Sequence, residues 1–349
     1  MVGPGLKEAS ARFLPHADPA LLDEGARNLL LGCAELSAGQ RVAILHEDPA
    51  LGWYDLAAPR AVAKVAQDLG GYTTIVEVGG PGTFLSPSAR AATAAANIEI
   101  WFARIGDQDR FAAREPGRTT LVSYARTAEA LASGFGTRPH AEMVDLKHRI
   151  DTVLAKAKSI EVTCPLGTHL RGNQMGAEPE DVTVRRFPMC VPRPVKANSF
   201  SGRVALTGFL SPTGSRSYTP ASLPIPGVVL AQIENGKIMD FEGDAWTVER
   251  IRQHYDHVAS LFGIAPQSVH SWHPGLHDGC VFHKPASDDP DLWSNSVFGS
   301  PRWLHFHTCG DYAPGEICWM VAEPTVTADD KDIWRAGRLV PDAAFGLED

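Results

Sequence analysis

The first half of the chain alternates segments that carry apolar residues at helical spacing with short runs of β-branched and aromatic residues. The helix-like segments cover residues 21–36, 55–69, 88–96 and 147–157, and the strand-like runs cover residues 41–46, 72–78, 98–103 and 119–123. Strands separated by helices typically form one sheet with helices on both faces. The pattern therefore predicts an α/β fold whose N-terminal part is a doubly wound, mostly parallel sheet.

The pattern changes after Cys164, where strand-like runs follow one another without helices between them. Two such runs, at 227–234 and 237–242, are separated by Asn235 and Gly236. An Asn-Gly pair between alternating apolar runs is the strongest local signal for a tight hairpin. This part of the sequence therefore predicts an α+β structure built on antiparallel sheet.

Length and charge narrow the classes of protein that fit. A chain of 349 residues favours two domains, and we expect an α/β domain at 1–163 and an α+β, metal-binding domain at 164–349. With 32 Lys and Arg against 41 Asp and Glu, the formal net charge is −9, which excludes a basic nucleic-acid-binding platform.

No apolar run is long enough to cross a bilayer, and the N-terminus lacks the apolar region of a signal peptide. Six cysteines without a CxxC pair favour reduced thiols, so we expect a cytoplasmic protein. From the net charge and the lack of a long apolar run, we expect neither a nucleic-acid partner nor a membrane partner.

Histidines are concentrated in one region. Eight of the thirteen lie at positions 254, 257, 270, 273, 277, 283, 305 and 307. His305 and His307 flank Phe306 in a strand-like run, and side chains alternate between the two faces of a strand. Both imidazoles are therefore expected on one face, where they could bind one metal ion. A third ligand is expected from 269–278. His254 and His257 form a rival pair on a predicted helix, but the charged residues around them are typical of a solvent-exposed helix face.

Other site motifs fit the sequence poorly. HExxH is absent, and the residues after His307 lack the Asp and His that the metallo-β-lactamase pattern requires. A glycine-rich nucleotide loop has little support, and no GxSxG elbow is present. Arg185 and Arg193 lie beside the proline-rich stretch 187–192 and are candidates for attracting an anionic substrate. A solvent-exposed charged loop explains the two arginines as well.

Four segments together resemble one known superfamily. They are the run 163–170, the hairpin 233–242, the histidine-bearing segment 269–277 and the strand at 305–307. In this order they resemble the aminopeptidase T-like superfamily, and most closely its 2,5-dihydroxypyridine 5,6-dioxygenases, which open a hydroxylated pyridine ring with Fe(II) and O2. The resemblance extends from about residue 20 to 330. It implies a non-haem iron enzyme that acts on a small aromatic molecule and O2.

The resemblance also implies which residues hold the metal. The family's loop histidine matches His270, the histidine of its HxD pair matches His305, and its aspartate falls on His307. A histidine in place of the aspartate raises the formal charge of an Fe(II) site by one. The peptidase branch of the superfamily uses two cations bridged by a carboxylate, so a histidine at this position disfavours peptidase activity.

Further roles are implied around the metal. The family's substrate-facing histidine is absent from the corresponding loop here, where Asp107 is the candidate for proton transfer, together with His273 and His169. Trp272 and Tyr312 are expected to line a dry pocket for a flat ring.

Three interpretations remain open. The first is an Fe(II)-dependent dioxygenase that cleaves a hydroxylated aromatic or N-heteroaromatic ring. The second is a zinc-dependent hydrolase or lyase, because zinc in a three-histidine site lowers the pKa of bound water to about 7. The third is a catalytically silent binding protein. A homo-oligomer is also expected, since members of the superfamily assemble through the C-terminal half.

Overall fold

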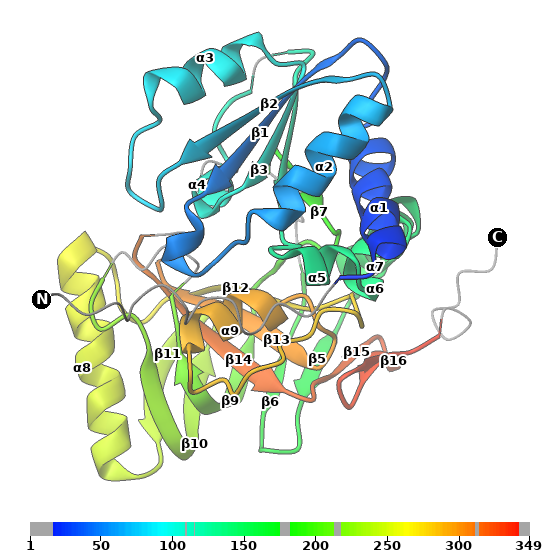
Figure 1. Ribbon diagram of the computed structural model, residues 1–349. Coiled ribbons are helices and arrows are strands. Elements are labelled where there is room, and N and C mark those ends of the chain that lie inside the picture. The colour runs from blue at the N-terminus through cyan, green and yellow to red at the C-terminus, as the bar shows by residue number, and fades with distance from the viewer. Residues whose placement is uncertain are drawn as a thin grey trace, which may run out of the picture.

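Three β-sheets organise the described part of the chain: a parallel sheet of five strands and antiparallel sheets of eight and four strands (Figure 1). The computed structural model describes residues 17–108, 110–114, 116–174, 182–212, 218–310 and 314–341. The α/β class, with a parallel N-terminal sheet and antiparallel sheet after it, is confirmed. No helix within these ranges combines the length and the hydrophobicity that a membrane span requires.

The parallel sheet has the strand order β2-β1-β3-β4-β7. Its strands are β1 (Arg41–Glu47), β2 (Tyr72–Val78), β3 (Ile98–Phe102), β4 (Thr119–Ser123) and β7 (Arg185–Phe187). The helical elements of this half are α1 (Pro19–Arg27), η1 (Asn28–Cys33), η2 (Pro49–Leu51), α2 (Ala57–Asp68), α3 (Pro87–Ala95), α4 (Arg104–Gln108), α5 (Ala128–Leu131), α6 (Gly134–Thr137) and α7 (His140–Lys156). α1 and α2 cover one face and α3 covers the other, so the sheet is doubly wound (Figure 1). The strand order reverses between β1 and β3, and sheets of this kind bind ligands at that point, beyond the carboxyl ends of the strands.

Local sequence explains several of these elements. α1 and α3 each begin with a proline that follows a capping side chain, since Asp18 and Ser86 accept hydrogen bonds from amides of the first turn. β1, β3 and β4 are almost completely buried, as expected of inner strands covered on both faces, whereas β2 is an exposed edge strand. The helix expected at 21–36 is α1 followed by the π-helical segment η1.

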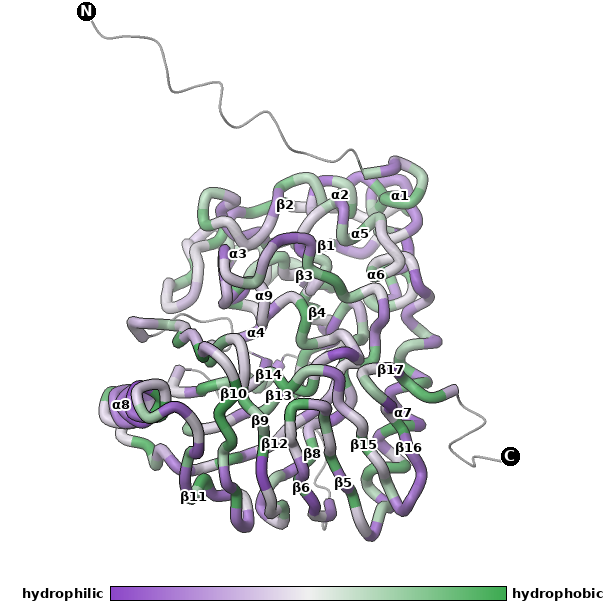
Figure 2. The backbone as a smooth tube through the Cα atoms, turned by 90° about the horizontal axis from the view of Figure 1, so that it is seen from below, coloured by the Kyte–Doolittle hydropathy of each residue, from purple (hydrophilic) through white to green (hydrophobic). Residues whose placement is uncertain are grey.

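The antiparallel half contains the other two sheets. The eight-stranded sheet has the order β11-β10-β9-β6-β5-β15-β16-β17, and the four-stranded sheet has the order β14-β13-β12-β8. Their strands are β5 (Ile160–Thr163), β6 (His169–Gly172), β8 (Val195–Lys196), β9 (Ser201–Leu210), β10 (Leu223–Glu234), β11 (Lys237–Glu242), β12 (Val269–Pro274), β13 (Trp303–Cys309), β14 (Glu316–Ala322), β15 (Thr325–Ala328), β16 (Lys331–Arg335) and β17 (Arg338–Leu339), with helices α8 (Ala245–Phe262) and α9 (Pro290–Val297). α8 stands at one edge of the molecule and is mainly hydrophilic in Figure 2. The expected hairpin joins β10 to β11, with Asn235 and Gly236 both at positive φ, 48° and 71°.

The sheets exchange strands across the boundary expected at 163/164. β5 precedes this point but belongs to the eight-stranded sheet, and β7 follows it but joins the parallel sheet beside β4. A single cut at this point therefore does not separate the parallel sheet from the antiparallel ones. The two-domain division remains a prediction.

The four-stranded sheet has two different faces. One face packs against the eight-stranded sheet, and there Trp272, Phe306 and Trp319 are completely or almost completely buried in the largest hydrophobic core. The alternate residues of the same strands, among them His273 and His305, lie on the opposite face. The carboxyl ends of the parallel strands lie toward that face, and the arrowheads of β1 and β2 point to the antiparallel half in Figure 1.

Candidate metal centre

Three histidines from two adjacent strands meet on one face of the four-stranded sheet. His273 on β12 stands directly opposite His305 on β13, and His307 follows two residues along β13 on the same face. The ring centroids of His305 and His307 are 4.7 Å apart, and the ring of His273 lies 5.2 and 5.3 Å from them. One nitrogen of each ring lies within 4.8 Å of the other two, so the three side chains can share one metal ion.

Several nitrogens of this cluster have no hydrogen-bond partner within the described parts of the chain. They are Nδ1 of His273, both ring nitrogens of His305 and Nε2 of His307, and all four are buried. Leaving a buried polar atom unpaired costs about 1–3 kcal/mol. A divalent cation would pair one nitrogen of each ring at once, so the residues present fit a bound metal ion.

Burial keeps two of the imidazoles in the neutral form that binds metal. Burial, followed by the neighbouring His307, lowers the pKa of His305 to about 3, while Glu316 opposes the shift. Burial, followed by His305, His307 and Arg186, also lowers the pKa of His273 well below its usual value. Both rings therefore offer a lone pair at neutral pH without first losing a proton.

A carboxylate lies directly behind His307. Glu316, the first residue of β14, accepts a hydrogen bond from Nδ1 of His307, and its side chain is 1% exposed. This bond leaves Nε2 of His307 for the cluster, which is how metal-binding histidines are usually held in orientation. The thiol of Cys318 donates to Oε1 of Glu316 at 3.6 Å, and His307, Glu316 and Cys318 form a second group whose ligand atoms lie within 4.8 Å of one another.

His270, the histidine expected as the third ligand, is not part of the three-histidine cluster. It lies at the bulge of β12, where the pairing register with β13 shifts. Its Nε2 is 2.8 Å from the carbonyl oxygen of Cys309. His273, expected to serve in proton transfer, stands where the third ligand was expected. The reason is the alternation along β12, because Trp272 faces the core and its neighbour His273 therefore faces His305.

Asp107 lies at the carboxyl edge of the parallel sheet, on the side of the histidines. Its Oδ1 accepts a hydrogen bond from the hydroxyl of Tyr124 at 2.9 Å, and Nη1 of Arg110 lies 3.6 Å from its Oδ2. Burial acts to lower the pKa of Arg110, but the charges of Asp107, Tyr124 and Glu316 outweigh burial and raise the pKa. Tyr124, which binds Asp107, also contacts the ring of Phe298, and Phe298 lies beside His273 and His305, so Asp107 is on the side of the parallel sheet that meets the metal-binding face.

An aromatic side chain bridges this edge and the cluster. The ring of Phe298 lies 6.3 Å from the rings of both His273 and His305. On its other side it makes an edge-on contact with Tyr124, with 5.2 Å between the ring centroids. Phe298 thus supplies an apolar wall beside the candidate metal position.

Two other expected residues lie away from the cluster. His169 on β6 is 61% exposed, and its Nε2 pairs with Oε1 of Glu161 at 2.7 Å. Trp272 is completely buried, with its ring 5.4 Å from Phe200 and 6.4 Å from Phe306 in the core between the antiparallel sheets. His169 therefore lies on the surface of the eight-stranded sheet, and Trp272 lies on the wrong face of its strand to line a pocket beside the histidines.

The two expected arginines also have other surroundings. Arg185 pairs with Glu35 at 3.0 Å and donates to the backbone carbonyl of Cys33 in η1. It therefore lies on the face of the parallel sheet that α1 and α2 cover, away from the cluster. The backbone amide of Arg193 donates to Asp151 of α7 at 2.7 Å. Tyr312 lies outside the described residues.

Sequence analysis missed Glu316, Phe298 and Arg110. For Glu316 a signal exists, because residues 316–322 read as a buried apolar strand and a charged residue in such a strand needs a polar partner. No local signal points to Phe298 or Arg110, because their neighbours come from distant parts of the chain.

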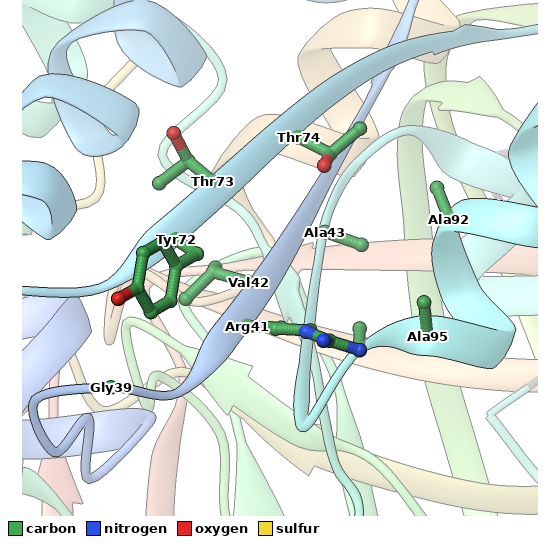
Figure 3. A pocket seen from close by; sticks show the side chains of 10 residues that line it. Gly39, Arg41, Val42, Ala43, Tyr72, Thr73, Thr74, Ala92 and Ala95 are labelled. Carbon is green, nitrogen blue, oxygen red and sulfur yellow. The ribbon is translucent and has the colours of Figure 1, made fainter.

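A cavity of about 590 Å³ lies at the opposite end of the parallel strands. It is lined by the first residues of β1 and β2 and by the last turn of α3, including Arg41, Tyr72 and Ala95 (Figure 3). Its lining contains none of the histidines and none of the carboxylates described above. The cavity therefore plays no part in the candidate metal centre.

Solved structures share the fold of this chain, although no known family model and no curated protein matches it. The 2,5-dihydroxypyridine dioxygenase from Pseudomonas putida KT2440 aligns with a TM-score of 0.62 at 16% sequence identity, over 94% of this chain and 99% of that chain. AmpT from Thermus thermophilus aligns with a TM-score of 0.50 at 14% identity, over 92% of this chain and 99% of that chain. At these identities the similarity establishes a common fold.

Proposed function

We propose that this protein is a mononuclear Fe(II)-dependent dioxygenase that cleaves a hydroxylated aromatic or N-heteroaromatic ring with O2. The observation that carries the proposal is the cluster of His273, His305 and His307, whose inward nitrogens have no partner in the described residues. One of the solved structures that share this fold is a dihydroxypyridine dioxygenase. The substrate class is inferred from that neighbour and from the aromatic wall at Phe298.

The charge of the site supports iron chemistry despite the missing aspartate. Three neutral imidazoles around Fe(II) give a formal charge of +2, whereas two histidines and a carboxylate give +1. Glu316 restores the lower value, because its buried carboxylate lies one hydrogen bond behind His307. We infer that Glu316, behind His307, supplies the negative charge that an aspartate at position 307 would place directly on the metal.

Each surrounding residue has a definite part in the proposed reaction. Bound Fe(II) would provide the electronic link between substrate and O2, whose direct reaction is spin-forbidden. His273, His305 and His307 would hold the metal through one ring nitrogen each, which would leave coordination positions for the substrate and O2. Asp107, held by Tyr124 and Arg110, accepts the proton of a ring hydroxyl. Phe298 packs against the flat ring and excludes water.

Oxygen consumption tests the proposal. The protein is loaded with Fe(II) without oxygen, and O2 uptake is recorded with dihydroxypyridines, catechols and their carboxylated derivatives. We expect substrate-dependent uptake and two oxygen atoms from ¹⁸O2 in the product. Absence of uptake across the panel, in protein that holds one iron per chain, would overturn the proposal.

A zinc-dependent hydrolase or lyase is the second candidate. The observation that favours it is the donor set itself, because three neutral imidazoles are also a common zinc site. This candidate predicts that the protein purifies with zinc and that its activity is unchanged when oxygen is removed. A binding protein without activity predicts that His305→Ala leaves the metal content unchanged.

A further inference from the structure

The carboxyl edge of the parallel sheet collects positive charge in a chain that is acidic overall. Arg104 follows β3, Arg126 follows β4, Arg186 lies on β7 and Arg110 follows α4. The chain as a whole has a formal net charge of −9. This edge contains the point where the strand order reverses between β1 and β3, which is where sheets of this type bind ligands.

Arg126 is the unusual member of this group. It is 8% exposed, and its buried Nε has no hydrogen-bond partner in the described parts of the chain. Its guanidinium lies 5.0 Å from the ring of Trp53 and 5.7 Å from the ring of Tyr54, and its Nη1 is 3.5 Å from Oγ of Ser296. A buried guanidinium normally has a carboxylate or phosphate partner, because an unpaired buried charge is costly.

The carboxylates of this edge are engaged elsewhere. Glu47 is completely buried and pairs with Arg104 at 2.6 Å. Asp55 accepts hydrogen bonds from two helix amides, and Asp107 accepts one from Tyr124. No ion pair joins Arg126 to an acidic side chain of the described residues. Within the described residues, Arg126 is therefore a buried, planar, five-donor cation that no carboxylate neutralises.

Arg126 is also connected to the candidate metal centre. Its Nη1 reaches Ser296, and Phe298, two residues further, has its ring 6.3 Å from that of His305. In parallel, Tyr124, two residues before Arg126, contacts the ring of Phe298 at 5.2 Å. The guanidinium, the aromatic wall and the histidines thus follow one another across the junction of the parallel and four-stranded sheets.

We propose that Arg126 binds the carboxylate of the substrate, so that the substrate class is hydroxylated aromatic or N-heteroaromatic carboxylic acids. This inference rests on the proposed function. The bidentate geometry of a guanidinium matches a carboxylate. The ring of Phe298 offers an apolar surface for a planar substrate between the guanidinium of Arg126 and the histidines.

Calorimetry with matched ligands tests the assignment. Binding of 2,5-dihydroxybenzoate, the corresponding carboxamide, hydroquinone and inorganic phosphate is measured to metal-free and to zinc-loaded protein. We expect wild type to bind the carboxylate at least about tenfold more tightly than the carboxamide, because hydrogen bonds between two charged groups are stronger than those to a neutral amide. Arg126→Gln should remove this preference by weakening only the carboxylate, and the exposed-site control Arg60→Gln should keep it.

Arg126→Lys keeps the charge without the planar fork, and it supplies the same comparison if the Gln variant does not fold. It should bind the carboxylate more weakly than wild type and more tightly than Arg126→Gln. A carboxylate preference that survives both substitutions would overturn the proposal, as would its absence in wild type or phosphate binding as tight as that of the carboxylate. O2 uptake with neutral diols but no carboxylate preference would overturn only this assignment. A preference without O2 uptake would overturn only the dioxygenase.

Discussion

Replacing Glu316 with Gln should weaken metal binding without dismantling the site. The amide has nearly the same shape as the carboxylate and can still accept a hydrogen bond from Nδ1 of His307, so the substitution mainly removes one buried negative charge. A carboxylate on one side of an imidazole lies about 7 Å from a cation on the other, and at an effective dielectric constant of about 20 its attraction to a divalent ion is about 4.7 kcal/mol. Loss of such an outer partner typically costs about 10–100-fold in metal affinity, or about 1.4–2.8 kcal/mol. The cost is smaller than the Coulomb attraction because the amide of glutamine still accepts the hydrogen bond from His307.

The assay is anaerobic titration of metal-free protein with Fe(II) in competition with a chromophoric chelator. Glu161→Gln is the matched control, because Glu161 makes a similar contact to His169 on an exposed strand. We expect the control to bind Fe(II) as wild type does, while Glu316→Gln binds about 10–100-fold more weakly. Equal affinity of Glu316→Gln and wild type would refute the idea that this carboxylate supplies the charge of the missing aspartate.

Three further predictions concern the core, the proposed reaction and the response to pH. Trp272→Ala should lower the free energy of unfolding, measured in urea titrations, by about 3–5 kcal/mol. The Fe(II) affinity should stay unchanged, because the indole is buried on the face opposite the histidines. A loss of Fe(II) affinity would contradict this prediction. Asp107→Asn should retain one iron per chain but turn over about 10²–10⁴ times more slowly, and wild-type turnover would remove Asp107 from proton transfer. Burial lowers the pKa of His254 to about 4 in the folded state, so the unfolded chain takes up this proton first and the metal-free protein loses stability as the pH falls from about 6.5 toward about 4. His254→Gln should flatten this dependence by at most about 1.4 kcal/mol per pH unit, and an unchanged slope in urea titrations would contradict the assignment.

The sequence predicts the alternating half of the fold well, because each of these elements has a local cause. The expected strands at 72–78 and 119–123 coincide with β2 and β4, and the Asn-Gly hairpin is where it was predicted. The strand β7 was not predicted. It has three residues, and it joins the parallel sheet by pairing with β4, more than sixty residues earlier, which no local pattern reveals.

The candidate site could be predicted only as far as strand alternation reaches. Alternation correctly puts His305 and His307 on one face of β13. It fails for the third histidine, because His270 lies at a bulge and the choice between it and His273 depends on which face of β12 meets the core. Trp272 is buried in the core between the antiparallel sheets, so its neighbour His273 faces His305. The burial of Trp272 depends on how the sheets pack, and the local sequence of β12 does not reveal it.

Residues that depend on packing between sheets were beyond the sequence. Phe298 and Arg126 come from loops that meet only where the parallel sheet lies against the four-stranded sheet. Arg185 was expected to attract substrate, but in β7 it faces the helices while its neighbour Arg186 influences His273. A shift of one residue along a strand exchanges the two faces, so proximity in sequence cannot identify the functional arginine.

The most direct test of the central claim is the iron content of two single-histidine variants. Wild type, His273→Ala and His270→Ala are loaded with Fe(II) anaerobically, desalted and analysed for metal per chain. A centre formed by His273, His305 and His307 predicts about one iron per chain in wild type and in His270→Ala, and loss of iron in His273→Ala. Iron retained by His273→Ala, or lost from a folded His270→Ala, would contradict it.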